Sequence, residues 1–153
     1  MDQPLISVVI CTRNRAAVLA ETLRHLEGCR IPVDTTVEFI LVDNNSSDGT
    51  RQVIEDFVRR SSVRAIYVFE GRQEVAAARN TGCRTARGDI IAMIDDDVIP
   101  HEQFLKQLHD EFARAQVLCI IGGRVELWNA LHAAVTIDLL PDSWTALSWK
   151  IPV

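Results

Sequence analysis

Three adjacent aspartates, Asp95, Asp96 and Asp97, end an apolar run in the segment GDIIAMIDDDVIP at residues 88–100. If the run is a strand that continues through the triplet, Asp95 and Asp97 point to one face about 6.6 Å apart. At an effective dielectric of about 20, two carboxylates at that separation repel each other by about 2.5 kcal/mol. Either water relieves this repulsion at an exposed turn, or a cation binds there and gives the cluster a function.

Other polar clusters offer hydrogen-bonding groups, and one of them contains an arginine suited to phosphate. CTRNR (11–15) and DNNSSDGT (43–50) each follow an apolar run, and Arg79 begins the short segment RNTG (79–82). Arginine suits phosphate because its planar guanidinium donates two parallel hydrogen bonds. A cation held by carboxylates, together with a few arginines, is a combination that can hold a small anionic ligand.

Apolar periodicity predicts alternating strands and helices that position these clusters. The expected strands are short and rich in β-branched residues, as is typical of strands covered on both faces. Pro100 is expected in the first turn of the last helix, where its fixed backbone angle is favourable. We predict strands at 5–12, 37–43, 64–70, 89–95 and 117–123, with helices around 18–26, 47–60 and 74–86 and from Pro100 onward.

This alternation predicts an α/β fold with a mainly parallel, Rossmann-like sheet and helices on both faces. In such sheets, ligands bind beyond the carboxyl ends of the strands. The polar clusters follow the first, second and fourth predicted strands, so we expect them to converge on one edge of the sheet. That convergence indicates a binding site.

Composition limits the class of protein. The chain has 153 residues, of which 48% are hydrophobic and 24% charged, which is typical of one globular domain with a substantial core. The formal net charge of −5 argues against a general nucleic-acid binder, because such proteins usually carry a basic surplus. A small anionic ligand held by a metal ion and a few arginines is still compatible with this charge.

The cysteines and the chain termini favour a cytoplasmic protein. Four cysteines, Cys11, Cys29, Cys83 and Cys119, are widely spaced and form no C-x-x-C pair, which favours reduced thiols over a zinc site or a disulfide framework. The sequence has neither a signal-peptide pattern nor a run near the roughly 20 apolar residues that cross a bilayer. The alternative location is a peripheral one, at the inner face of the membrane.

Four motifs together resemble one enzyme family. SVVICTRNR, FILVDNNSSDGT, AAARNTGCRTARGDIIAMIDDDVIP and IGGRV occur in the order seen in family 2 glycosyltransferases, the nucleotide-sugar-dependent enzymes of the GT-A fold. The resemblance covers residues 5–126. Each motif alone is weak, but the set is specific. It implies that the aspartate triplet is the family's D-x-D motif, with Asp97 ligating Mg²⁺ or Mn²⁺ and Asp95 or Asp96 contacting the ribose.

The same resemblance implies a nucleotide pocket. Asp43 matches the position that accepts a hydrogen bond from the nucleobase, for which a uracil, guanine or thymine edge is a suitable donor. Thr12 and Arg15 match the lining of the base and ribose pocket, and Arg79 matches a position near the base or diphosphate. We therefore expect a nucleoside diphosphate sugar as ligand, with a UDP-sugar as the first choice.

Structural roles compete with some of these assignments. The aspartate triplet could cap the helix that begins near Pro100 and interact with its dipole. Asp48 and Asn14 have the side chains of helix N-caps, and Asp48 is expected to cap the helix that follows it. Gly82 is expected to permit close packing of its helix on the sheet.

The resemblance does not extend to the whole reaction. An inverting transferase needs a general base to deprotonate the acceptor, and the family's carboxylate for this lies about ninety residues beyond D-x-D. Asp138, Glu126 and Asp142 do not have that spacing. We expect residues 1–126 to form the donor-binding domain and 127–153, which holds all three tryptophans, to begin an incomplete acceptor-side half. An amphipathic arm is the alternative for this tail.

The resulting hypothesis is an inverting, metal-dependent glycosyltransferase of cell-envelope polysaccharide biosynthesis. Its acceptor is expected to be a saccharide, a lipid-linked molecule or another group, and we expect little or no transfer by this chain without the general base. Two alternatives are a non-catalytic nucleotide-sugar-binding or regulatory module and a nucleotidyltransferase. A nucleotidyltransferase also uses metal-bound aspartates, but it usually has a glycine-rich loop after its first strand, and CTRNR contains no glycine. Dehydrogenase and P-loop motifs are absent from the sequence.

Overall fold

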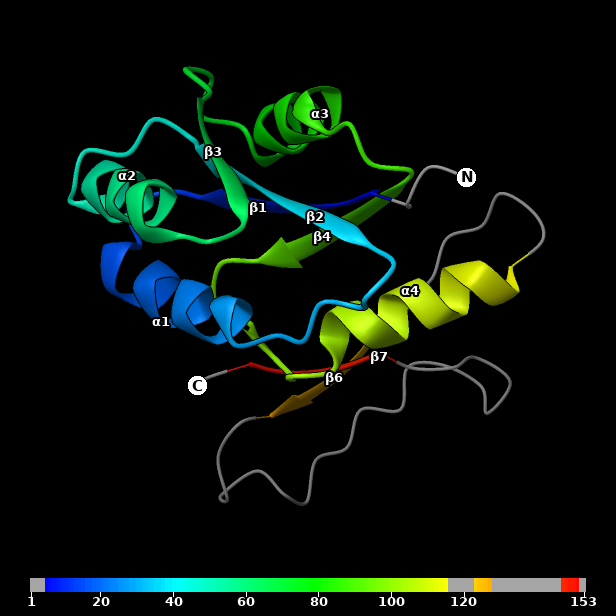
Figure 1. The fold of residues 1–153 in the computed structure, drawn as a ribbon. Helices are drawn as coiled ribbons and strands as arrows, with labels where there is room; N and C mark the ends of the chain where they lie inside the picture. Colours follow the sequence, from blue (N-terminus) through cyan, green and yellow to red (C-terminus); the bar gives the residue numbers. More distant parts are fainter. Residues whose placement is uncertain (1–4, 116–122, 128–146, 152–153) are drawn as a thin grey trace.

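The computed structural model describes residues 5–115, 123–127 and 147–151 (Figure 1). Its main sheet contains four parallel strands in the order β3-β2-β1-β4. The strands are β1 (Leu5–Thr12), β2 (Thr36–Asp43), β3 (Arg64–Phe69) and β4 (Ile90–Asp95). These four lie within one residue of the predicted ranges at each end, which confirms the parallel α/β architecture.

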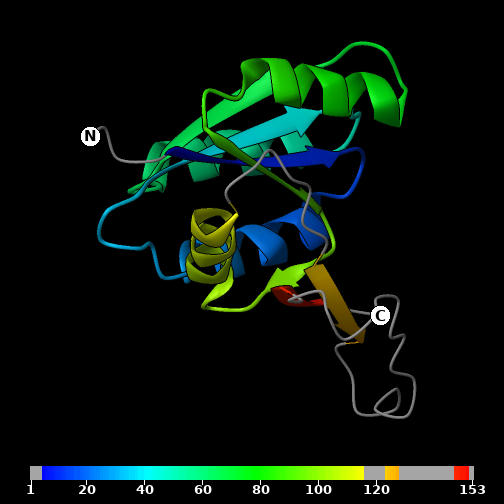
Figure 2. The same ribbon diagram turned by 90° about the vertical axis from the view of Figure 1, so that its right-hand side faces the viewer.

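Helices cover both faces of this sheet (Figures 1 and 2). They are α1 (Ala16–Glu27), α2 (Thr50–Arg60), α3 (Val75–Thr85) and α4 (Phe104–Arg114). One face packs against α1, α2 and α4 through a large apolar cluster that includes Phe39, Phe57 and Phe104. The other face packs against α3 through Val9, Val42 and their neighbours. Burial on both faces explains why β1 and β2 are almost continuously apolar.

Strand β4 differs because it lies at an edge of the described part of the sheet. Its side chains alternate between buried and exposed, and Ile91 and Met93 on the α3 side are each 42% exposed. Helix α3 packs on β1 and β2. The side of β4 that holds Asp95 is therefore open to solvent, whereas the other side faces the core.

Gly82 brings α3 close to the sheet, as predicted. A Cβ atom on Gly82 would lie 2.4 Å from Cγ1 of Val9 and 3.2 Å from Cγ2 of Val42. Real Cβ atoms essentially never come within 2.4 Å of another carbon, so a larger residue would force α3 or the Val9 side chain to shift. The close approach fixes the height of α3 above the sheet.

A second, three-stranded sheet has the order β5-β7-β6 and lies next to α1 and α4. Its strands are β5 (Ile99–Pro100), β6 (Gly123–Leu127) and β7 (Leu147–Ile151). The predicted helix start at Pro100 is wrong: Pro100 pairs with Trp149 in the antiparallel β5–β7 ladder, and α4 begins at Phe104. Such a short strand at a sheet edge can contain a proline, because proline can occupy a position whose backbone N–H makes no hydrogen bond to the neighbouring strand.

The expected strand at 117–123 lies outside the described residues except for Gly123, which opens β6 in the smaller sheet. The proposed boundary after residue 126 therefore falls within β6. In the tail, the described segment β7 pairs in parallel with β6. None of the helices in the described ranges has the length and apolar character needed to cross a bilayer.

Candidate functional site

The carboxyl ends of the parallel strands bring the polar clusters to one edge of the main sheet. In the register, Thr12 lies opposite Asp43, Cys11 lies opposite Asp95, and Asp43 lies opposite Phe69. The first, second and fourth predicted strands therefore end side by side, with β1 between β2 and β4. The expected convergence of their loops is confirmed.

Asp96 is the most firmly held aspartate of the triplet. Its side chain is 9% exposed, and its Oδ2 accepts a 2.6 Å hydrogen bond from the Thr12 hydroxyl. Its Oδ1 accepts one of 3.0 Å from Nη1 of Arg15, and its backbone carbonyl accepts one of 2.7 Å from the hydroxyl of Thr22 on α1. These contacts fix the turn after β4 against β1 and α1.

Asp97 is more accessible and makes fewer contacts. Its side chain is 33% exposed, and its Oδ2 lies 2.8 Å from the same Nη1 of Arg15. The hydrogen bond to Asp97 and the charge of Asp96 raise the pKa of the Arg15 guanidinium above its ordinary value. One nitrogen of Arg15 thus bridges a buried and an exposed carboxylate.

Asp95 points away from this pair. Strand β4 ends at Asp95, and residues 96 and 97 form a turn, so strand alternation does not continue through the triplet. The expectation that Asp95 and Asp97 share one face is wrong for that reason. Asp95 instead pairs with Arg79 of α3, with 3.3 Å between Oδ1 and Nη2, and more than half of each side chain is exposed.

Asp43 is buried at the end of β2, with only 2% of the residue exposed. Its Oδ1 accepts a 2.9 Å hydrogen bond from the backbone N–H of Ser46, and its Oδ2 accepts one of 3.2 Å from the Tyr67 hydroxyl. Burial and the Asp43 carboxylate raise the pKa of the Tyr67 phenol. Both oxygens are oriented by the protein, and each has a remaining lone pair.

The loops after β1 and β2 are hydrogen-bonded to each other. Asp48 accepts hydrogen bonds from the backbone N–H of Thr50 at 2.9 Å and of Ala16 at 3.2 Å, which are the first residues of α2 and α1. The hydrogen bonds from Thr50 lower the pKa of Asp48. The N-cap position of α2 is Gly49 and not Asp48, but the Asp48 carboxylate, one residue earlier, binds the first N–H of α2 and also that of α1.

Asn14 does not cap α1, contrary to the alternative considered above. It has a φ of 53°, in the left-handed region where asparagine is more common than most residues. Its Oδ1 accepts a 2.7 Å hydrogen bond from the Ser47 N–H, and its own N–H donates to the Ser46 hydroxyl at 2.9 Å. The N-cap position of α1 belongs to Arg15. This places the Arg15 side chain beside the aspartates.

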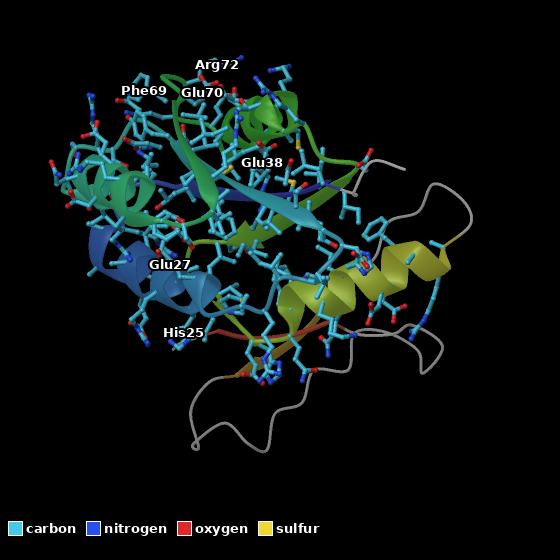
Figure 3. The ribbon with its side chains drawn as sticks, viewed as in Figure 1. His25, Glu27, Glu38, Phe69, Glu70 and Arg72 are labelled. Carbon is cyan, nitrogen blue, oxygen red and sulfur yellow. The ribbon has the colours of Figure 1, made fainter. Side chains whose placement is uncertain are left out.

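Glu70, which follows β3 at the same edge, is a polar residue that the sequence patterns did not single out (Figure 3). Glu70 is 8% exposed. It accepts three hydrogen bonds of 2.9–3.1 Å from Arg72 and one of 2.6 Å from the Thr81 hydroxyl on α3. These bonds, those from Arg72 first, lower the pKa of Glu70 to about 2. The sequence feature that could have identified Glu70 was an acidic residue at the end of the predicted strand 64–70, with an arginine two positions later.

Phe69 and Gly71 flank Glu70 at this edge. Phe69 is 55% exposed and lies opposite Asp43 in the register of β2 and β3. The carbonyl of Gly71 accepts a 3.2 Å hydrogen bond from Nδ2 of Asn45. The loops after β2 and β3 are thereby joined, just as the loops after β1 and β2 are.

The donor set at the aspartates fits part of a divalent-cation shell. Oδ1 of Asp96 and Oδ2 of Asp97 both contact a single positively charged nitrogen, so two carboxylate oxygens already converge on one cationic group. Within the described ranges, no group of three or more histidine, cysteine, aspartate or glutamate side chains could hold a metal ion. Mg²⁺ commonly takes only one or two protein carboxylates and completes its shell with water and substrate phosphates.

Comparisons with known proteins agree with this architecture. The family model described as Glycosyl transferase family 2 matches residues 7–127. Glycosyltransferase AglE of Haloferax volcanii is 32% identical over 123 residues, which are 80% of this chain and 40% of that protein. Hyaluronan synthase of Pasteurella multocida is 28% identical over 146 residues, 90% of this chain and 15% of that protein.

Two solved structures share the fold. S. aureus TarS 1-349 in complex with UDP-GlcNAc matches with a TM-score of 0.71 and 20% identity, over 82% of this chain and 35% of that one. The mannosyltransferase PcManGT from Pyrobaculum calidifontis, in complex with GDP-Man and Mn²⁺, matches with a TM-score of 0.66 and 25% identity, over 82% and 36%. The fold is that of the GT-A glycosyltransferases. With its family model matched over residues 7–127, the chain belongs to glycosyltransferase family 2.

Proposed function

We propose that this chain binds a nucleoside diphosphate sugar, with a UDP-sugar as the first choice, as the donor-binding part of an inverting, metal-dependent glycosyltransferase. The observation that carries the proposal is the pair of carboxylates, Asp96 and Asp97, that converge on one nitrogen of Arg15. This pair lies at the same edge of the sheet as Asp43. A diphosphate bound there would be near positive charge, with the nucleobase within reach of the β2 end.

The nucleoside is proposed to bind across the ends of β1 and β2. Asp43 would accept a hydrogen bond from a base N–H, because its two oxygens are oriented by Ser46 and Tyr67 and still have free lone pairs. Thr12 donates its hydroxyl proton to Asp96, so only its oxygen is available to accept from a ligand. Asp95 or Asp96 would contact the ribose. Asp95 is the more accessible of the two, with 69% of its side chain exposed.

The diphosphate is proposed to bind between the aspartate turn and the arginines. Asp97 would hold Mg²⁺ or Mn²⁺, since it has an exposed carboxylate beside an existing cationic group. When bound, such an ion neutralises the diphosphate and stabilises the charge on the leaving group. Arg79 would donate hydrogen bonds to phosphate oxygens, as expected from the sequence. Arg15, which the resemblance assigns to the base and ribose pocket, is proposed to contact the phosphates because its guanidinium lies at the aspartate turn. Each of the two guanidinium groups is about half exposed.

The buried contacts of Asp96 keep this arrangement in place before a ligand arrives. Thr12 and Thr22 hold its carboxylate and its backbone carbonyl, respectively. A turn held in this way positions Asp97 without an ordering step during binding. The mannosyltransferase PcManGT, which shares the fold and was solved with GDP-Man and Mn²⁺, supports the choice of ligand class and cation.

Transfer itself is a further proposal. The chain spans between 15% and 43% of the lengths of the curated relatives it matches. The general base is therefore not assigned to a described residue, and donor binding is proposed as the measurable property of residues 1–126. Residues 127–153 are proposed to begin the acceptor side. A saccharide acceptor in envelope polysaccharide synthesis stays a prediction, for which hyaluronan synthase among the relatives, named for a polysaccharide product, offers a parallel. A cytoplasmic location also stays a prediction.

Calorimetric titration of UDP into the protein with Mn²⁺ tests the proposal. We expect binding that needs the metal and that is lost in Asp97→Ala, with the thermal melting curve unchanged. Asp56→Asn is the matched control, because Asp56 is an exposed carboxylate of α2 whose partners, Gln52 and Arg59, lie on the same helix. Equal UDP affinity in wild type and Asp97→Ala would contradict the proposal. A panel of UDP-, GDP- and dTDP-sugars would then define the donor.

A further inference from the structure

Arg15 occupies the point at which the two carboxylates of the aspartate turn meet. A single atom, Nη1, lies 3.0 Å from Oδ1 of Asp96 and 2.8 Å from Oδ2 of Asp97. A guanidinium that bridges two carboxylates supplies the positive charge that a divalent cation would supply there. A metal ion at the proposed site and the Arg15 guanidinium would therefore compete for the Asp97 carboxylate.

The backbone of Arg15 is fixed while much of its side chain is free. Its N–H donates to the Thr50 hydroxyl at 3.2 Å, and its carbonyl accepts from the Leu19 N–H at 2.9 Å. The side chain is 48% exposed. Within the described part of the chain, only Nη1 of the guanidinium is engaged, so Nε and Nη2 can donate to another acceptor. A half-exposed guanidinium with two free nitrogens suits a phosphate group.

The two carboxylates hold Arg15 unequally. Asp96 is nearly buried and also bonded to Thr12, so its position is set by the fold. Asp97 is one-third exposed, and Arg15 is its only partner among the described side chains. If Arg15 gives up one contact, the contact with Asp97 is the one that can be replaced without disturbing the turn.

We propose that Arg15 acts as a resident cation that holds Asp97 in the ligand-free protein and turns to the diphosphate when a divalent ion takes that carboxylate. This inference rests on the proposed function, because it concerns the same metal and diphosphate. It gives Arg15 a positioning role toward Asp97 that the sequence patterns did not predict. Metal and nucleotide should therefore bind cooperatively, because the metal releases Arg15 from Asp97 and the diphosphate draws Arg15 away from that carboxylate.

The coupling has a measurable size. An ion pair with this exposure changes a binding constant by about two- to five-fold. Removing Arg15 should therefore tighten the binding of Mn²⁺ alone by about that factor. It should also reduce the factor by which UDP strengthens Mn²⁺ binding, and by linkage the factor by which Mn²⁺ strengthens UDP binding falls equally.

Electron paramagnetic resonance of free Mn²⁺ gives the binding constant of Mn²⁺ alone and its binding constant in the presence of saturating UDP. Neither measurement needs an activity assay. The variants are Arg15→Gln, which removes the charge, and Arg15→Lys, which keeps the charge but loses the planar fork. We expect Arg15→Gln to bind Mn²⁺ alone more tightly than wild type. Arg15→Lys should bind Mn²⁺ alone as wild type does but lose most of the enhancement by UDP. If Arg15→Gln proves unfolded by circular dichroism, Arg15→Lys alone decides the proposal.

Arg24→Gln is the matched control, because Arg24 is an exposed arginine in the last turn of the same helix and pairs with Glu21. Unchanged or weaker Mn²⁺ binding in Arg15→Gln, with a wild type that binds Mn²⁺ and UDP, would overturn the role of Arg15 and leave donor binding intact. Wild-type behaviour of Arg15→Lys in both titrations would overturn the contact with the diphosphate. A wild-type protein that binds no UDP with Mn²⁺ would overturn the proposed function and this inference together.

Discussion

Replacing Thr12 by valine would test whether the aspartate turn is held in place from β1. Thr12 is 4% exposed, and its hydroxyl donates the 2.6 Å hydrogen bond to the buried carboxylate of Asp96. Valine has nearly the same shape, so the substitution removes the donor and leaves no cavity. The acceptor stays buried and charged.

The structure sets the expected size of the effect. Losing a hydrogen bond to a charged group costs about 1.5–3 kcal/mol. Asp96 keeps its contact with Arg15, so we expect a value in the lower half of that range, about 2 kcal/mol in the free energy of unfolding. For a chain of this length, that corresponds to a fall of about 4–8 °C in the melting temperature.

Urea denaturation followed by circular dichroism at pH 7 measures this free energy directly. Thr12→Ser is the matched control, because serine keeps the hydroxyl and loses one methyl group, which costs about 0.8 kcal/mol. The slope of the transition should be the same in all three proteins, since the exposed surface on unfolding does not change. We therefore expect the order of stability wild type, Thr12→Ser, Thr12→Val.

The reasoning would be refuted by a valine variant within about 0.5 kcal/mol of wild type, the usual range for substitutions that touch nothing important. It would also be refuted by a serine variant as unstable as the valine variant. Either result would mean that the hydrogen bond to Asp96 does not stabilise the turn, and the preorganisation proposed for Asp97 would lose its support.

Two further predictions concern α3 and the end of β3. Gly82→Ala gains up to about 1 kcal/mol of helix propensity, but a Cβ 2.4 Å from Val9 overpacks the core at a cost of about 1–3 kcal/mol. We expect a net loss of about 1 kcal/mol in urea titrations, largely reversed by adding Val9→Ala, and a stabilised Gly82→Ala would disprove the close approach. Glu70 has a pKa of about 2 in the fold, below its ordinary value of 4.5, so its contribution to stability is complete above pH 4.5 and is lost as the pH falls toward 2. Glu70→Gln should therefore flatten the dependence of stability on pH between 4.5 and 2, and an unaltered slope there would contradict the role of Arg72 in lowering that pKa.

The sequence was sufficient to predict the main sheet because its strands have strong local patterns. β1 and β2 are buried on both faces, so their apolar runs have sharp ends, and the predicted 5–12 coincides with Leu5–Thr12. The helix predicted from Pro100 failed because proline also suits a short strand at a sheet edge. The choice was settled by pairing with β7, some fifty residues further on, which no local pattern contains.

The candidate site was predictable in location but not in its contacts. Thr12, Arg15, Asp96 and Asp97 were all chosen from the sequence, yet the bridge from Arg15 to both aspartates joins residues more than 80 positions apart. It depends on the register that sets Cys11 beside Asp95 and on the turn that ends β4. The contacts of Glu70 were only partly readable: Arg72 is a local partner two positions later, but Thr81 lies on α3, whose distance from the end of β3 depends on how that helix packs.

The shared carboxylate of Asp48 has a consequence for the proposed binding site. One side chain accepts hydrogen bonds from the first backbone N–H of both α1 and α2, and the N–H of Arg15 donates to the Thr50 hydroxyl, so the loops after β1 and β2 are tied to each other. The backbone of Arg15 is thereby anchored beside the β2 loop, while its half-exposed side chain is not. Donors of different size would then be accommodated by rotation of that side chain and not by separation of the two loops.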